Sequence, residues 1–188
     1  MATKYLQKFE SASQLIAHAP DTGAAQGIGS IDGQVFVNEA GTARPIGQPA
    51  MVTETGDFTV TQAEHANRTT LLGNAAGGAV TLPAATGSGN KYRMVVSVLL
   101  TSAAWTITCG AATILNGMAL INNTGDSSTA TVDAYPTGAS DEIFAFTQSL
   151  GAGKIGDFVE FEDIAAGIFA VRAHIQGEAD PATPFASA

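Results

Sequence analysis

Apolar and polar residues alternate with a period of two along much of the chain. In one such run, Trp105, Ile107 and Cys109 share one face, and threonines occupy the other. A period of two is that of a β-strand with one buried face. The same pattern predicts a strand over 167–176 with a core face of Phe169, Val171, Ala173 and Ile175.

Further short apolar segments recur between turns rich in glycine, asparagine and serine. They predict strands at 58–61, 79–82, 91–101, 104–109, 113–116, 118–122, 129–134, 142–147 and 157–162. One helical turn is expected at 62–67, and no longer amphipathic helix is expected after it. Many short strands separated by such turns predict an all-β fold. We expect an antiparallel β-sandwich that is jelly-roll-like.

The first 48 residues have a different pattern from the rest. Their apolar residues are dispersed among polar ones, so this segment buries too little to fold alone. We expect an extended N-terminal arm that becomes ordered on partner subunits. Tyr5, Leu6 and Phe9 are the expected anchors, because large apolar side chains dominate interface energies. The alternative is that these three side chains pack on the β domain of their own chain.

The arm is expected to end in a small hairpin. Residues 34–37 and 43–46 read as two strands joined by a loop with a glycine. Pro45 confines the second strand to an edge, because proline lacks the N–H that a ladder needs. The predicted domains are therefore 1–48, the arm and hairpin, and 49–188, the β-sandwich.

Composition and charge narrow the class of partner. Hydrophobic residues make up 45% of the 188 residues and charged residues 13%, about half the usual charged share. So little charge indicates either a surface coated with threonine, serine and alanine or a surface largely buried against other subunits, and we expect a mixture of the two. The net charge of −9 and the scattered basic residues argue against a nucleic-acid partner.

Residues 1–20 lack the layout of a secretory signal, and the longest strongly apolar stretch, 94–100, is too short to cross a bilayer. We expect no membrane partner and synthesis in the cytoplasm.

Candidate chemistry is sparse. The single cysteine, Cys109, allows no intrachain disulfide and is expected in the core as a small hydrophobe. We expect His18 in the arm, His65 in a polar turn and His174 on the exposed face of its strand, and their spacings match no metal-binding motif. We expect no catalytic residue, cofactor or metal site, so the protein is predicted not to be an enzyme.

The strongest exception is the acidic cluster of Asp157, Glu160, Glu162 and Asp163. Glu160 and Glu162 share one face of the predicted strand, about 7 Å apart. That arrangement could suit the paired carboxylates of a glycosidase or a calcium ion. The interpretation we favour is a solvated strand face with Val159 and Phe161 directed inward.

Two segments resemble virion structural proteins of tailed bacteriophages. They are Thr81–Arg93, which reads TLPAATGSGNKYR, and Ile155–Gly167, which reads IGDFVEFEDIAAG and is followed by Ala170–Arg172. The ending Pro181–Phe185 fits the same pattern. In this order they resemble head decoration, or capsid cement, proteins over about residues 58–186.

The resemblance implies a β-rich, commonly trimeric protein on the outer surface of an icosahedral head. Its partners would be the major capsid protein and copies of itself, and it would stabilise the expanded shell. We expect the β domain to trimerise around an apolar seam while the arms reach neighbouring capsid subunits. The family brings no catalytic residues.

Two alternatives stay open. One is a tail fibre, spike or neck component of the same virion. The other is a carbohydrate-binding or carbohydrate-cleaving β domain, for which Tyr92, Tyr135 and Phe144 are the candidate aromatic contacts.

Overall fold

The computed structural model describes residues 51–123, 131–147, 152–177 and 182–187 with their side chains. Before residue 51 it describes the backbone of four strands. The chain divides into two compact units, Met1–Ala50 and Met51–Ala188. The boundary expected from the sequence, between residues 48 and 49, lies two residues earlier.

The first unit contributes a four-stranded sheet in the order β1-β2-β3-β4, with every neighbouring pair antiparallel. Pro45 ends β4 at the edge of this sheet. The strands are β1 (Gln14–Leu15), β2 (Gly27–Ile31), β3 (Gln34–Glu39) and β4 (Thr42–Pro45).

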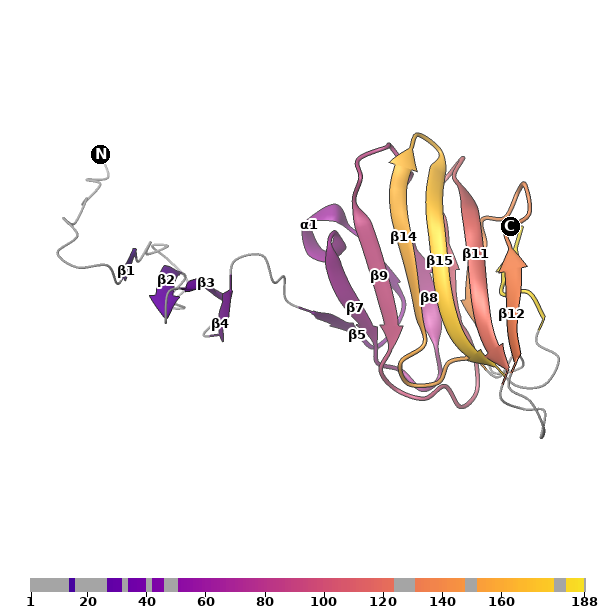
Figure 1. Cartoon of the computed structure of the whole chain (residues 1–188), viewed down its shortest axis with the longest axis horizontal. Coiled ribbons are helices and arrows are strands. Elements are labelled where there is room, and N and C mark those ends of the chain that lie inside the picture. The colour runs from indigo at the N-terminus through magenta and orange to yellow at the C-terminus, as the bar shows by residue number, and fades with distance from the viewer. Residues whose placement is uncertain are drawn as a thin grey trace. The chain divides into compact units, whose positions relative to one another are not determined.

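The second unit is built on a seven-stranded sheet, which faces the viewer in Figure 1. Its spatial order is β12 (Thr131–Pro136), β11 (Ile114–Asn123), β15 (Ile168–Gly177), β14 (Phe158–Ala165), β9 (Lys91–Val96), β7 (Arg68–Leu72) and β5 (Val52–Glu54).

A five-stranded sheet lies behind the first. Its order is β16 (Phe185–Ala186), β13 (Ile143–Phe146), β10 (Trp105–Thr108), β8 (Gly78–Thr81) and β6 (Phe58–Thr59). The single helix of the described residues, α1 (Gln62–His65), lies between β6 and β7 in the chain, at the helical turn that the sequence predicts. The all-β prediction is confirmed.

From β5 to β11 the chain alternates between the two sheets, so successive strands of one sheet run in the same direction. β5, β7 and β9 pair in parallel, and so do β6, β8 and β10. β11 and β15 are also parallel. The expectation of antiparallel sheets is therefore wrong: both sheets are mixed. Alternation along a strand indicates burial, but it does not encode the direction of the neighbouring strand.

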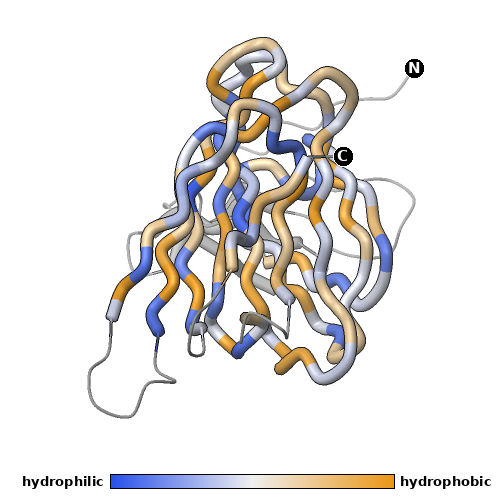
Figure 2. Tube along the Cα trace, turned by 90° about the vertical axis from the view of Figure 1, so that its right-hand side faces the viewer, coloured by the Kyte–Doolittle hydropathy of each residue, from blue (hydrophilic) through white to orange (hydrophobic). Residues whose placement is uncertain are grey.

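A late hairpin completes the larger sheet. β14 and β15 pair antiparallel and lie between β9 and β11, which precede them in the sequence. The inner faces of both sheets pack around one hydrophobic core. Phe144 of the smaller sheet contacts Phe161 of the larger edge-on at 6.3 Å between ring centroids, and Phe161 contacts Phe169. Figure 2 shows the resulting alternation of hydrophobic and hydrophilic positions along the strands.

The core faces expected from alternation are confirmed. Trp105 and Ile107 are fully buried, and Cys109 is 8% exposed. Phe169, Val171, Ala173 and Ile175 are all buried.

Two strand boundaries differ from expectation. β9 ends at Val96 rather than residue 101, and the chain bends at Val98. β11 runs through Gly117, where we expected two separate strands. A Cβ at Gly117 would collide with the Val171 carbonyl oxygen, so the glycine permits close approach of β15 instead of breaking the strand.

Candidate functional site

The four carboxylates of the acidic cluster, three on β14 and Asp157 directly before it, lie in two different environments. Glu160 and Glu162 lie on the outer face of the seven-stranded sheet, whereas Val159 and Phe161 are buried, as the interpretation we favoured requires. Asp157 and Asp163 are 1% and 3% exposed. The four acidic residues therefore do not form one cluster.

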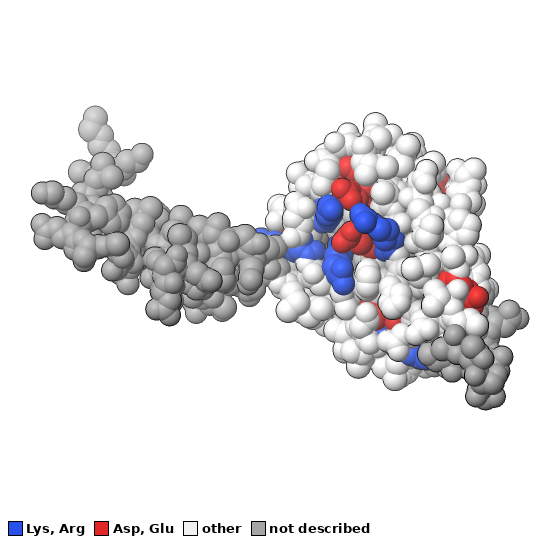
Figure 3. Space-filling model, viewed as in Figure 1, with Lys and Arg blue, Asp and Glu red and all other residues white. Residues whose placement is uncertain are grey.

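Cations on the neighbouring strands engage the two outer carboxylates. Arg172 of β15 places Nη2 3.1 Å from Glu162 Oε2 and 3.6 Å from Glu160 Oε1. Lys91 of β9 places Nζ 3.4 Å from Glu162 Oε2. Arg93 lies beside them, with its guanidinium 4.1 Å from the centroid of the Phe158 ring. Figure 3 shows these charges gathered over the middle of the sheet.

This arrangement does not suit a calcium ion shared by the two carboxylates. The Arg172 guanidinium lies within reach of both carboxylates, where a shared calcium ion would have to sit. Among the described residues, no group of three or more His, Cys, Asp or Glu side chains could hold a metal ion. The network is an ion-paired sheet surface.

Asp163 is turned inward and holds a loop. Its carboxylate accepts hydrogen bonds from the backbone N–H groups of Thr86, Gly87 and Ser88, at 2.6–3.1 Å, and from the hydroxyls of Thr86 and Ser88. Burial raises its pKa, but the bonds from Ser88, Gly87 and Thr86 outweigh this and lower the pKa to about 2. Gly87 has a φ of +79°, a backbone conformation that residues other than glycine rarely adopt.

Backbone bonds join the same loop to the β14–β15 turn. Gly89 donates to the Asp163 carbonyl at 2.8 Å, and Gly167 donates to the Ala85 carbonyl at 2.9 Å. Thr86 and Ala166 form an isolated bridge. The segments Thr81–Arg93 and Ile155–Gly167, which carry the resemblance, are thus in direct contact through β9, β14 and this loop.

Asp157 has a similar structural position at the other end of β14. Its carboxylate accepts from the backbone N–H groups of Gly153, Lys154 and Gln176 at 2.9–3.0 Å. Burial raises its pKa, and these hydrogen bonds offset the rise only in part. It ties the turn before β14 to the end of β15.

His65 is buried at 2% exposure, although we expected it in a polar turn. Nδ1 accepts from the Thr61 N–H at 3.1 Å, and Nε2 lies 3.4 Å from Glu54 Oε1. The ring stacks on Phe58 at 5.4 Å between centroids. The histidine side chain therefore packs against β5 and β6 at the start of the domain. His174 is exposed on β15, as expected, and His18 lies outside the described residues.

Burial and the nearby Glu142 carboxylate raise the pKa of Cys109 to about 12. The thiol is therefore protonated at neutral pH, as its expected role in the core requires.

The aromatic side chains considered for carbohydrate binding do not line an exposed surface together. Tyr92 is 3% exposed and Phe144 is fully buried, while Tyr135 is partly buried and packs on the core. Tyr5, Leu6 and Phe9, the expected arm anchors, lie outside the described residues.

Comparison with protein-family models, curated proteins and solved structures found no match. In the part of the chain described here, no helix is long and apolar enough to cross a membrane.

Sequence reasoning missed two features. The first is the loop that Asp163 holds. The sequence signal for it was the segment Thr86–Gly89, which has many hydrogen-bond donors and no carboxylate of its own to bind them. The second is an outward apolar strip on β11 and β12. The signal there was that Met118 and Leu120 alternate with Ala119 and Ile121, which gives one strand two apolar faces.

Proposed function

We propose that this chain is a non-enzymatic virion structural protein, which binds the outer surface of a tailed-phage capsid as an oligomer and stabilises the shell. Its partners in this proposal are the major capsid protein and copies of itself. The location at the capsid surface comes from the resemblance to head decoration proteins.

The observation that carries the proposal is the contact between the two segments of the resemblance. Asp163 in the second segment accepts hydrogen bonds from five donor groups of Thr86–Ser88 in the first. Two short, low-complexity motifs separated by more than sixty residues are therefore one structural unit. Because the two segments form one structural unit, a resemblance that covers both supports a fold related to that of the decoration proteins more strongly than a resemblance of either segment alone.

The use of the polar side chains gives independent support. Glu160 and Glu162 are neutralised by cations, and Asp157 and Asp163 hold loops. The Cys109 thiol is buried. These groups contribute to a rigid domain, which is what a shell-stabilising protein requires. A sandwich-like stacking of the two sheets belongs to this proposal, and a jelly-roll path stays a prediction.

In the proposed mechanism the two units of the chain have different roles. The β domain holds several copies together, and the segment before residue 49 contacts the shell through Tyr5, Leu6 and Phe9. One such segment alone would bind weakly, because ordering it costs conformational entropy. Several held in one oligomer raise the effective concentration, so the assembly binds far more tightly than one copy.

The copy number of the chain in purified particles tests the location. Quantitative mass spectrometry against the major shell protein should give close to one copy per shell subunit. A few copies per particle would move the protein to a tail fibre, spike or neck, and absence from particles would refute the proposal.

A second experiment tests the anchors. Replacing Tyr5, Leu6 and Phe9 together by serine should abolish binding to undecorated shells and leave the oligomer intact. The matched control replaces Lys4 and Lys8 by serine in the same segment and should retain binding. Unchanged decoration by the triple variant would refute the arm mechanism.

A further inference from the structure

We propose that a cationic patch on the outer face of the seven-stranded sheet docks an acidic segment of a partner protein, and that Arg93 binds its carboxylate. The patch comprises Lys91, Arg93 and Arg172, on the strands β9 and β15 that flank β14. In the proposed function this partner is a subunit of the shell. The inference rests on that function only for the identity of the partner, because carboxylate binding can be measured without a shell.

Arg93 is the cation of the patch that is left without a carboxylate. Its cross-strand neighbour on β14 is Glu160, but Glu160 places Oε1 3.6 Å from Nη2 of Arg172 instead. Arg172 and Lys91 both engage Glu162, at 3.1 Å and 3.4 Å. No carboxylate among the described residues forms an ion pair with Arg93. Three cations therefore share two carboxylates, and the unpaired positive charge lies at Arg93.

Contact with Phe158 positions Arg93 without using its hydrogen-bond donors. The central carbon of the guanidinium lies over the Phe158 ring, 4.1 Å from the centroid. The ring attracts the charge through its face, whereas the N–H donors lie in the plane of the guanidinium. None of these donors forms a hydrogen bond with a described residue. The side chain therefore keeps the planar pair of donors with which arginine binds both oxygens of a carboxylate.

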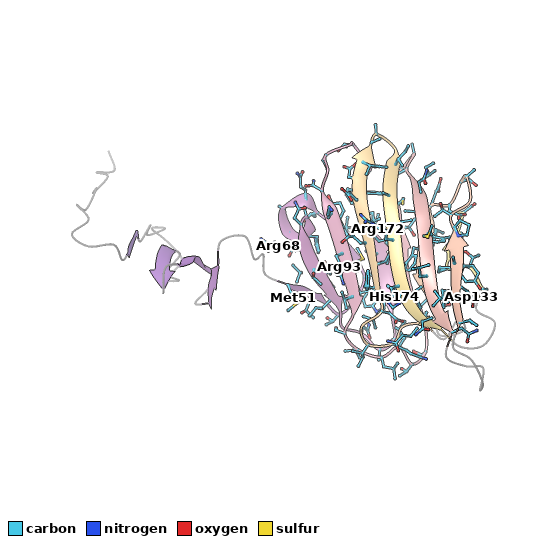
Figure 4. All side chains as sticks on the ribbon, viewed as in Figure 1. Met51, Arg68, Arg93, Asp133, Arg172 and His174 are labelled. Carbon is cyan, nitrogen blue, oxygen red and sulfur yellow. The ribbon has the colours of Figure 1, made fainter. Side chains whose placement is uncertain are left out.

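The cations of the patch project further from the sheet than its carboxylates do. The side chains of Arg172 and Lys91 are 64% and 48% exposed, whereas those of Glu160 and Glu162 are 23% and 27% exposed. In Figure 3 the blue side chains surround the red ones in the middle of this face, and Figure 4 labels Arg93 and Arg172 on it. A partner that approaches this face therefore meets positive charge first.

The contrast in sign with the rest of the chain favours an acidic partner. The chain has a net charge of −9, and outside the patch its acidic residues far outnumber its basic ones. An acidic surface is repelled by most of this protein and attracted at the patch. The patch therefore determines which face of the β domain such a partner contacts.

A nucleic acid fits the patch less well than an acidic polypeptide. Binding to a phosphate backbone requires cations that neutralise several phosphates. The patch offers a single unpaired cation, and Glu160 and Glu162 beside it repel phosphate. One unpaired arginine matches one carboxylate of a folded partner. Several copies in one oligomer would multiply this weak contact.

Titration of the full chain with a short oligoglutamate peptide, followed by nuclear magnetic resonance, tests the inference. The side-chain Nε–H resonance of Arg93 should shift on addition of the peptide, and oligoglutamine of the same length should leave it unchanged. Arg93→Gln should raise the Kd for oligoglutamate about threefold to tenfold, because it removes one charge-assisted contact to both carboxylate oxygens.

The matched control is Arg68→Gln, which removes an arginine of the same domain outside the patch. It should bind oligoglutamate like the natural chain. Arg93→Lys keeps the charge but not the planar donors, so its Kd should lie between those of the natural chain and Arg93→Gln. Equal Kd values for Arg93→Gln and Arg68→Gln overturn the inference. Tighter binding of a single-stranded oligonucleotide of equal charge also overturns it.

Two further measurements identify the partner. Shells that bind the natural chain and Arg93→Gln equally contradict the inference alone, whereas a chain that binds oligoglutamate through Arg93 but no shells contradicts the proposed function alone. Sedimentation of the full chain tests a second copy as the occupant. Self-association that Arg93→Gln abolishes would assign the patch to another copy and overturn the choice of a shell subunit.

Discussion

The two faces of the seven-stranded sheet are built from alternate residues of the same strands, yet they differ in almost every physical respect. On β14, Val159 and Phe161 are fully buried, whereas the adjacent Glu160 and Glu162 are partly exposed and ion-paired. The inner face gains its stability from close packing of apolar side chains. The outer face combines a charged network with exposed apolar side chains on β11 and β12.

The largest difference is expected between two phenylalanines three residues apart. Phe161→Ala should lower the free energy of unfolding by about 3–5 kcal/mol, because it leaves a cavity among packed rings. Phe158→Ala, on the outer face under Arg93, should cost about 1 kcal/mol. Urea unfolding followed by the fluorescence of Trp105 measures both, and equal losses would contradict the division between the faces.

Gly117 tests the closeness of packing between β11 and β15. Gly117→Ala should cost about 1–3 kcal/mol, because its Cβ would collide with the Val171 carbonyl oxygen and the strands would have to separate. The control is Gly56→Ala, whose Cβ would meet nothing within 4 Å. The same urea titration compares the two, and a neutral Gly117→Ala would show that β11 can shift at no cost.

Asp163 should make the free energy of unfolding depend on pH. Its pKa falls from 3.8 to about 2 on folding, so the ionised form stabilises the native state. That contribution, about 2 kcal/mol, is complete above pH 4 and is lost as the pH falls from about 4 to about 2.

Asp163→Asn should therefore be less stable than the natural chain at pH 7, and the difference should shrink below pH 4. Thermal unfolding at several pH values measures it. Comparing the variant with the natural chain separates the contribution of Asp163 from that of Asp157, whose raised pKa changes stability with pH in the opposite direction. Glu162→Gln, on the outer face of the same strand, is the control, and an equal pH dependence in both variants would contradict the assignment.

The smallest effect is expected for the charged network. Arg172→Ala should cost less than about 1 kcal/mol, because the side chain is 64% exposed and solvent screens its two ion pairs. Concentrated salt should remove most of the difference in urea unfolding. A loss comparable to that of Phe161→Ala would mean that the outer face carries stability as well.

Alternation along single strands allowed the core faces to be predicted from sequence. The burial of Trp105 and Ile107, and of Phe169 and Val171, is local information, because it follows from the period of two within each strand. The inward direction of Val159 and Phe161 was predicted for the same reason.

Long-range partners could not be predicted in this way. Asp163 binds Thr86, seventy-seven residues away, and no periodicity in either segment encodes that contact. The same holds for His65, which lies in the expected polar turn but is buried by the Phe58 ring and the Glu54 carboxylate. The parallel pairings likewise depend on the path of the whole chain between two sheets.

The insertion of β14 and β15 between β9 and β11 has a consequence for synthesis on the ribosome. Until residue 177 has emerged, β9 and β11 lack the strands that join them, and the aromatic rings of Phe161 and Phe169 are missing from the core. Before that point the nascent chain contains two unconnected parts of the seven-stranded sheet, with their apolar faces exposed. Such a state is prone to aggregation. Ribosome-bound chains that stop before residue 158 should be cleaved readily by protease, and protection should rise sharply once the hairpin is complete.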